Sequence, residues 1–314
     1  MKYRFYIFSF LTLFFLAGCV SSSMQGRPVR IAVLGILDSL PLFVAEDQGY
    51  FRANGITVEL ITVGSAPERD QLFQAGQVDG MLNELVASMV LNQNQPRATV
   101  VRFLRVATPQ YPLFRILAAK DSGIKTPADL KGVPIGVSEG TVIEYVTDRV
   151  LNKAGLSSSD IKKIGVPKIP DRLGLLSSGQ LKAAVLPDPT ASIAIQAGAV
   201  VVIDDTTYPE VSHSVLTFST EMVKTRPQEV KAVLKAVEQA VSEINKNKSK
   251  YKQIMIDKKF APPEILEKYV IPDFPKASVP SEAQFMDSLT WAQSRGLIKD
   301  SLPYSSTVNS SFLP

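Results

Sequence analysis

Hydrophobic residues in this chain fall into two kinds of segment that alternate from residue 30 onward. Short apolar runs, typical of buried strands, occur at 31–34, 57–63, 78–82, 100–107, 113–119, 134–137, 164–168, 183–186 and 200–203. Segments with helical spacing of apolar residues follow most of these runs, at 40–49, 69–75, 85–91, 142–154, 170–178 and 190–197. Two more helices are predicted at 227–246 and 282–295. This alternation predicts an α/β protein.

The junctions between strands and helices consist mainly of small or polar residues. In the stretch 134–144, an apolar run meets a turn at Gly140, and Thr141 precedes Glu144 by the spacing of a capping box. Thr225 with Gln228, and Ser281 with Gln284, are predicted to start helices in the same way. A helix opened beyond the carboxyl end of a strand presents unpaired N–H groups, and α/β sheets bind small molecules there.

An internal repeat suggests two lobes of one topology. The pattern formed by Pro67, Arg69, Leu72 and the pair Gly76-Gln77 recurs 103 residues later, in the series Pro170, Arg172, Leu175 and Gly179-Gln180. Each copy leads into a predicted strand, at 78–82 and at 183–186. We therefore predict a first lobe formed by residues 29–110 and 208–314 and a second lobe formed by residues 111–207. The C-terminal helices are expected to pack on the first lobe.

The N-terminus has the features of an export signal. Lys2 and Arg4 precede a ten-residue apolar stretch at 7–16, which is shorter than the roughly 20 residues of a membrane-spanning helix. The sequence 16–19, LAGC, resembles a bacterial lipobox, which implies removal of residues 1–18 and a lipid on Cys19. Residues 19–28 would form a tether. The expected location is outside the cytoplasm, on a bacterial membrane.

Composition restricts the possible functions further. The 314 residues are enough for about two domains, and 45% are apolar. The formal charge of +4 falls to about +2 without the signal peptide, so nucleic acid is not an expected partner. Cys19 is the only cysteine, which excludes an intramolecular disulfide. No cofactor or metal motif is found, and we expect a monomer.

Several short motifs together resemble one family of binding proteins. They lie at 41–45 (PLFVA), 49–51 (GYF), 55–59 (GITVE), 75–80 (AGQVDG), 129–136 (DLKGVPIG) and 178–180 (SGQ). In this order they resemble the extracytoplasmic solute-binding proteins of bacterial ABC importers, in the group that binds sulfonates, nitrate or thiamine precursors. The resemblance implies a two-lobed periplasmic-binding-protein-like fold of type II, with two crossovers between the lobes.

The resemblance also implies a function and a site. A small molecule would bind in the cleft, the lobes would close, and a permease with its ATPase would receive the ligand. In the family the strand-to-helix loops of both lobes line the cleft, which here carries over to Leu37, Asp38, Ser39, Gly64, Ser65, Asn83, Glu84, Ser138, Glu139, Gly140, Thr141 and Asp188. The alternative role for Asp38, Ser65, Thr141 and Asp188 is helix capping alone.

Two other functions share these features. A ligand-sensing protein for a signalling receptor would differ only in its partner. An enzyme related to thiamine-pyrimidine synthases would have the same architecture, but its cysteine-rich motif has no counterpart here. His213, the only histidine, is interpreted as structural or hinge-lining and not as a general base.

Acidic residues at the junctions bear on the charge of the ligand. Asp38, Glu84, Glu139 and Asp188 lie at four junctions that contain no lysine or arginine, and the direction of Arg69 and Arg172 is left open. Carboxylates around one cleft would repel an anion. The sequence therefore favours a neutral or cationic, nitrogen-containing ligand over a sulfonate or nitrate.

Overall fold

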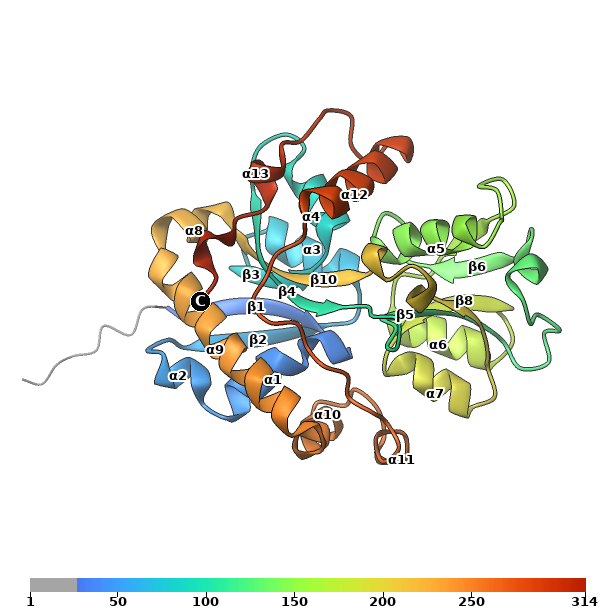
Figure 1. Ribbon diagram of the computed structural model, residues 1–314, viewed down its shortest axis with the longest axis horizontal. Coiled ribbons are helices and arrows are strands. Elements are labelled where there is room, and N and C mark those ends of the chain that lie inside the picture. The colour runs from blue at the N-terminus through green and yellow to red at the C-terminus, as the bar shows by residue number, and fades with distance from the viewer. Residues whose placement is uncertain (1–26) are drawn as a thin grey trace, which may run out of the picture.

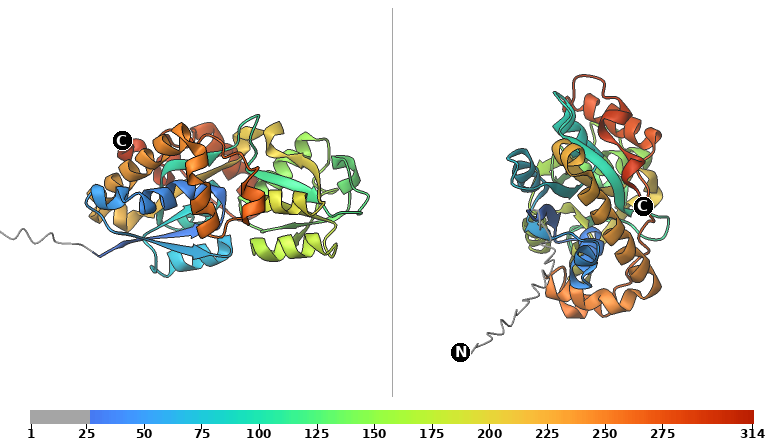
Figure 2. Two further views of the ribbon diagram at one scale, coloured as in Figure 1. Left: turned by 90° about the horizontal axis from the view of Figure 1, so that it is seen from below. Right: turned by 90° about the vertical axis from the view of Figure 1, so that its left-hand side faces the viewer.

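The computed structural model describes residues 27–314, which form two α/β lobes (Figure 1). The two lobes lie side by side along the long axis of the molecule (Figure 2). The predicted α/β class and two-lobed architecture are confirmed. The expected signal peptide, Cys19 and nearly all of the tether lie outside the described residues. Within residues 27–314, none of the helices has both the length and the apolar character needed to cross a membrane.

The first lobe contains a mixed sheet of five strands. Their spatial order is β2 (Val58–Val63), β1 (Val29–Leu34), β3 (Gly80–Asn83), β10 (His213–Ser219) and β4 (Ala98–Val106). β1 pairs in parallel with β2 and β3, whereas β10 runs antiparallel to β3 and β4. The carboxyl ends of β1, β2 and β3 therefore meet at one edge of the sheet.

The second lobe repeats this arrangement. Its strands follow the order β7 (Lys162–Gly165), β6 (Pro134–Val137), β8 (Ala183–Pro187), β5 (Phe114–Ala118) and β9 (Val200–Asp204). β6 pairs in parallel with β7 and β8, and β5 is antiparallel to β8 and β9. Helix α6 (Ile169–Ser177) begins and ends 103 residues after α3 (Ala66–Gln74), so the offset of the sequence repeat is also the offset of the structural repeat.

Helices cover both sheets. Those of the first lobe are α1 (Leu40–Asp47), α2 (Tyr50–Ala53), α3, α4 (Leu85–Asn92), α8 (Thr220–Thr225), α9 (Pro227–Lys246), α10 (Lys252–Asp257), α11 (Pro263–Leu266), α12 (Glu282–Ser294) and α13 (Tyr304–Thr307). The second lobe has α5 (Val142–Lys153), α6 and α7 (Thr190–Gln196). α9 lies along α1 and α2, where Val233, Leu234 and Val237 are fully buried in the larger apolar core.

Two predicted helix caps are confirmed, and they are equivalent in the two lobes. The Ser65 hydroxyl accepts a hydrogen bond from the third residue of α3, and the Thr141 hydroxyl accepts one from Ile143 in α5. In both helices the glutamate three residues after the cap accepts from the glycine before it, Gly64 or Gly140, at 3.0 and 2.7 Å. These bonds fix the two loops at the edges of their sheets.

Some elements differ from their prediction. β10 is not among the strands predicted from the sequence, because the polar residues Ser212, His213 and Ser214 hide the start of a strand that is buried on both faces. Thr225 does not start α9, since it is the last residue of α8 and its hydroxyl donates to the Glu221 carbonyl. The strand expected at 164–168 lies at 162–165 instead, where exposed lysines obscure the pattern.

The prediction that the C-terminal helices pack on the first lobe holds for α9 and is incomplete for α12. α12 lies against α4 of the first lobe and against α5 of the second. The Trp291 indole donates to Asp148 at 2.9 Å, and Asp287 pairs with Arg149 at 2.8 Å. Because α4, α5 and α12 share one apolar cluster, the two lobes are joined by packing as well as by the chain crossovers.

Candidate ligand-binding site

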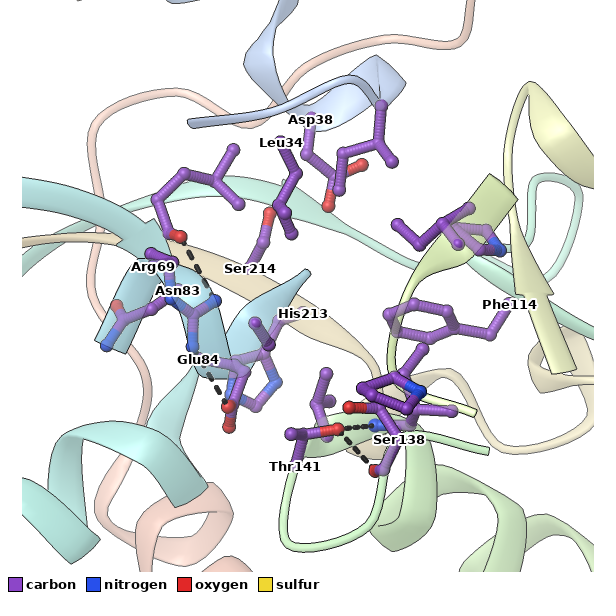
Figure 3. A pocket seen from close by; sticks show the side chains of 18 of the residues that line it. Leu34, Asp38, Arg69, Asn83, Glu84, Phe114, Ser138, Thr141, His213 and Ser214 are labelled. Carbon is purple, nitrogen blue, oxygen red and sulfur yellow. Dashed lines mark hydrogen bonds and ion pairs between the residues drawn. The ribbon is translucent and has the colours of Figure 1, made fainter. Parts of the chain in front are cut away.

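A cavity of about 50 Å³ lies between the lobes (Figure 3). Its apolar lining consists of Leu34, Ile36, Ala66, Leu82, Phe114, Val142, Ile143, Pro167, Ile169 and Pro187. Its polar lining consists of Asp38, Arg69, Asn83, Glu84, Ser138, Thr141, Arg172, His213 and Ser214. These residues come from the ends of β1, β3 and β8, from the loops after β1, β3, β6 and β7, from the starts of α3, α5 and α6, and from β5 and β10. Small apolar walls with a few convergent polar groups are typical of ligand sites.

Five of the predicted site residues line this cavity. Four of their side chains already have hydrogen-bond or ion-pair partners within the protein. Asp38 pairs with Arg105 at 3.3 Å, and the Asn83 amide donates to Ser88 at 2.8 Å. The Thr141 hydroxyl donates to the Ser138 carbonyl while it caps α5. Glu84 caps α4 by accepting from an amide of its first turn. The fifth, Ser138, has no hydrogen-bond partner for its hydroxyl among residues 27–314.

The other seven predicted residues lie outside the cavity lining, where most support its loops. The Ser39 hydroxyl donates to the Leu34 carbonyl at 2.6 Å, and Gly64 and Gly140 bind the glutamates described above. Ser65 caps α3, and Glu139 is exposed. The remaining two join the lobes, because the Leu37 amide donates to the Asp188 carbonyl at 3.1 Å.

Asp38 and Asp188 do not cap helices, which corrects the capping interpretation for both. Asp38 lies within a short 3₁₀ turn and pairs with Arg105. The Asp188 carboxylate pairs with Arg115 at 2.5 Å and accepts from the Ser192 hydroxyl at 3.0 Å, while Pro189 takes the cap position of α7. Arginines therefore neutralise both carboxylates.

Arg69 and Arg172 both line the cavity, although the sequence does not indicate where their side chains point. Arg69 and Arg172 occupy equivalent positions in α3 and α6, and both are almost completely buried. Each bonds a carbonyl thirteen residues further along the chain: Arg69 Nη1 donates to Leu82 at 3.2 Å and Arg172 Nε donates to Val185 at 2.9 Å. The repeat was the signal that could have identified them, because the equivalent arginines are held by carbonyls of the equivalent strands β3 and β8.

The two arginines differ in their charged neighbours. Arg69 Nη2 lies 2.7 Å from Asp70 Oδ1 and 3.9 Å from Glu84 Oε1. Burial raises the pKa of Glu84 to about 7, although the charge of Arg69 opposes this rise. Arg172 forms no ion pair with a carboxylate within residues 27–314, and burial lowers its pKa to about 10. It therefore remains a cation at neutral pH.

His213 lies at the start of β10 and lines the cavity (Figure 3). Its ring packs edge-on against Phe103, with 5.3 Å between the ring centroids. Burial lowers the pKa of His213 to about 4, so that the imidazole is neutral at physiological pH. The described part of the chain contains no cluster of histidine, cysteine and acidic residues suited to a metal ion.

The fold is similar to those of several solved structures. An alkanesulfonate-binding protein from Xanthomonas axonopodis pv. citri, bound to MOPS, has a TM-score of 0.76 and 19% identity, with 91% of this chain and 99% of that chain covered. A ligand-binding component of an ABC-type import system from Staphylococcus aureus has a TM-score of 0.77 and 13% identity, with 91% and 98% covered. The desulfurization enzyme DSZB has a TM-score of 0.64 and 16% identity, with 90% and 97% covered.

A sequence relative and a family profile complete the comparison. A Haemophilus influenzae protein named for thiamine biosynthesis is 29% identical over 130 residues, which is 41% of this chain. The match spans only 40% of that protein's length. The profile of the family described as NMT1/THI5 like matches residues 37–250, which include most of both lobes and most of the cavity lining. The chain therefore belongs to the NMT1/THI5-like family.

Proposed function

We propose that this chain is the solute-binding component of an ABC import system. It captures a small organic molecule in the cavity between the lobes and delivers it to a permease. The observation that carries this proposal is the position of the cavity, because loops of both lobes line it and each lobe alone would leave it open. Similarity to import-system and sulfonate-binding proteins supports the same role.

The small size of the cavity supports capture by closure. A cavity of about 150 Å³ holds a benzene ring, whereas this one measures about 50 Å³. A ligand must therefore enter while the lobes are apart. Few hydrogen bonds oppose such opening at the cavity itself: the Leu37 amide bonds Asp188 and the Ile169 amide bonds Gly64, the latter at 3.4 Å. Closure around a ligand would add the contacts made through the ligand to these two hydrogen bonds.

An enzyme is the less supported alternative, although DSZB shows that this fold is compatible with catalysis. The single histidine is neutral and buried against Phe103, and its Nδ1 has no hydrogen-bond partner among residues 27–314 that would orient the ring. A nucleophile paired with a general base is not found among the polar residues that line the described cavity.

Co-purification tests the proposed function. Protein purified from its own cells should release a small molecule on denaturation, detected by mass spectrometry. The variant Ala66→Phe places a large ring at the cavity lining and should release none, while Ala75→Phe, at the exposed end of the same helix, should behave as wild type. Absence of a released molecule from the wild type, with no stabilisation by any compound of a broad panel, would contradict the proposal.

Gene deletion separates the importer from a sensor. Loss of uptake of the co-purified compound in a deletion strain supports the importer. Unchanged uptake, with loss of the transcriptional response to the compound, would assign the chain to a signalling receptor instead.

The lipid anchor is part of the same proposal. Cys19 would carry acyl chains that hold the mature protein on the outer side of the cytoplasmic membrane or in the periplasm. Cys19→Ser should leave the longer precursor or release soluble protein, as seen by mass and by membrane fractionation. Unchanged mass and unchanged membrane attachment would contradict a lipidated Cys19.

A further inference from the structure

We propose that the cavity binds the anionic group of a small organic acid, a carboxylate or a sulfonate, and that Arg172 supplies the opposing charge. This inference rests on the proposed binding function, since it assigns a ligand class to the same cavity. It is drawn from the difference between two equivalent positions in the repeat.

The arginine of the first lobe is already neutralised. Arg69 Nε donates to Asp70 at 2.8 Å, and Glu84 approaches the same guanidinium at 3.9 Å. The residues 103 positions later, which are equivalent in the second lobe, are Leu173 and Pro187. Neither carries a charge. The second lobe thus keeps the arginine and lacks both of its acidic partners.

The arginine of the second lobe is held in place but is not satisfied. Arg172 donates from Nε to Val185 and from Nη1 to Val166, at 2.9 and 2.8 Å. Its Nη2 is buried and has no hydrogen-bond partner within residues 27–314. A fully buried cation without a counter-charge is costly, and an anionic ligand would remove that cost.

Two hydroxyl groups at the same cavity add donors from both lobes. Ser138 at the end of β6 and Ser214 in β10 are buried, and neither Oγ has a partner among the described residues. Side-chain donors that line one cavity from opposite lobes suit the oxygen atoms of a carboxylate or sulfonate. Such an anion would link the lobes in the closed form.

The acidic residues of the cavity do not oppose this assignment. Asp38 is paired with Arg105, and Glu84 lies beside Arg69. Glu139 and Asp188 lie outside the cavity lining. The expectation of a neutral or cationic ligand counted all four carboxylates as facing the cleft, whereas these two do not line this cavity. Arg172 is the one charged side chain of the cavity lining that has no ion-pair partner within residues 27–314, and a monoanion would supply that partner.

The rest of the ligand is expected to be apolar and short. The lining next to the polar groups includes Ile36, Phe114, Ile143 and Ile169. These side chains favour a hydrocarbon portion over a second charged group. The small volume of the closed cavity limits that portion to a few carbon atoms.

A series of isosteric compounds tests the ligand class on the wild-type protein. Thermal shift and calorimetric titration would compare acetate and methanesulfonate with the neutral acetamide and the cationic ethylamine. We expect an acid to bind at least tenfold more tightly than the amide or the amine. The two acids distinguish a carboxylate from a sulfonate ligand. Binding of the amide or the amine with equal affinity would overturn the inference and leave the proposed function intact.

Variants of two buried arginines test the proposed role of Arg172. Arg172→Gln should weaken binding of the acid by at least tenfold. Arg102→Gln is the matched control, because Arg102 is equally buried but lies outside the cavity lining. The affinity of this variant for the acid should equal that of the wild type. Equal affinity of Arg172→Gln and the wild type would contradict the assignment.

The charge of the co-purified molecule decides the remaining cases. If Arg172→Gln does not fold, or if none of the four compounds binds, the molecule released from wild-type protein is analysed by electrophoresis at neutral pH. An anionic molecule supports the inference, and a neutral or cationic molecule overturns it. Release of no molecule contradicts the proposed function itself.

Discussion

The two lobes of this protein hold the same residue at the same place and give it a different charge environment. Arg69 and Arg172 each bond a backbone carbonyl of a strand, thirteen residues further along the chain. Asp70 pairs with the first arginine, and Leu173 occupies the equivalent position beside the second. Both copies of the repeat hold the guanidinium by a backbone carbonyl, but only the first copy pairs it with a carboxylate.

This difference separates structural from ligand-binding roles. A buried arginine with a carboxylate partner and a carbonyl bond is explained by the protein alone. Arg172 has carbonyl partners but no ion pair within the described chain, so its charge is available to a ligand. Comparing equivalent positions within one chain thus identifies a candidate binding residue that burial alone would not, since both arginines are buried.

The largest expected effect comes from restoring the missing carboxylate. Leu173→Asp would place an acid beside Arg172 where Asp70 lies beside Arg69, and both positions are partly buried. A unit charge at about 4 Å is worth up to ~4 kcal/mol near a protein surface, so we expect acid affinity to fall by about 100-fold. Calorimetric titration measures this loss, and Leu173→Asn is the neutral control of similar shape.

The reciprocal change sharpens the same comparison. Asp70→Asn would free Arg69 from its nearest carboxylate, and acid affinity should rise while Leu173→Asp lowers it. An equal loss of affinity in Leu173→Asp and Leu173→Asn would show that shape, not charge, controls binding at this position.

The next largest expected effect is a pH dependence of the folding stability that arises from Glu84 in the first lobe. The pKa of Glu84 is raised to about 7 by burial, above its ordinary value of 4.5. The folded state therefore binds a proton more tightly than the unfolded state, and the contribution of Glu84 to stability falls as pH rises from 4.5 to 7. In the wild type, Glu84 should lower the unfolding free energy by about 2 kcal/mol over this range, and this decrease should be absent in Glu84→Gln.

Urea denaturation at pH 5 and pH 8 measures this effect for both proteins. The difference between wild type and Glu84→Gln matters, because Asp205 also has a pKa raised to about 7 and His213 has one lowered to about 4. A difference that does not change with pH would show that Glu84 is ionised throughout the range.

The smallest effects compare the two helix caps. Ser65→Ala and Thr141→Ala each remove a side-chain cap and should lower the unfolding free energy by about 1 kcal/mol. Only Thr141 lines the cavity, so ligand affinity should fall in Thr141→Ala and stay unchanged in Ser65→Ala. Equal affinities in both variants and the wild type would leave Thr141 with a capping role only.

Much of the fold could be predicted from the sequence because apolar runs and helical spacing determine which segments are buried. β6 has the predicted bounds, and so does the long helix α9. β10 could not be predicted in this way, because its first residues, His213 and Ser214, are polar although they lie in the centre of a sheet and are buried. Burial of polar groups in a central strand depends on neighbours that are distant in sequence.

The site was predictable at the level of loops and not of side chains. Strand ends indicate where loops lie, and Asn83, Glu84 and Ser138 from these loops line the cavity. Whether a side chain turns inward depends on its partner in space. Asp188 turns to Arg115, which the sequence does not reveal. Arg172 approaches the cavity from within a helix, and only the repeat connects it with a strand.

Small-angle X-ray scattering tests the central claim most directly, namely that the cavity forms by closure of two lobes around a ligand. Scattering of ligand-free protein would be compared with scattering at saturating concentration of the co-purified compound. We predict a smaller radius of gyration with the compound than without it. Identical curves with and without bound compound would contradict the account and indicate a rigid scaffold.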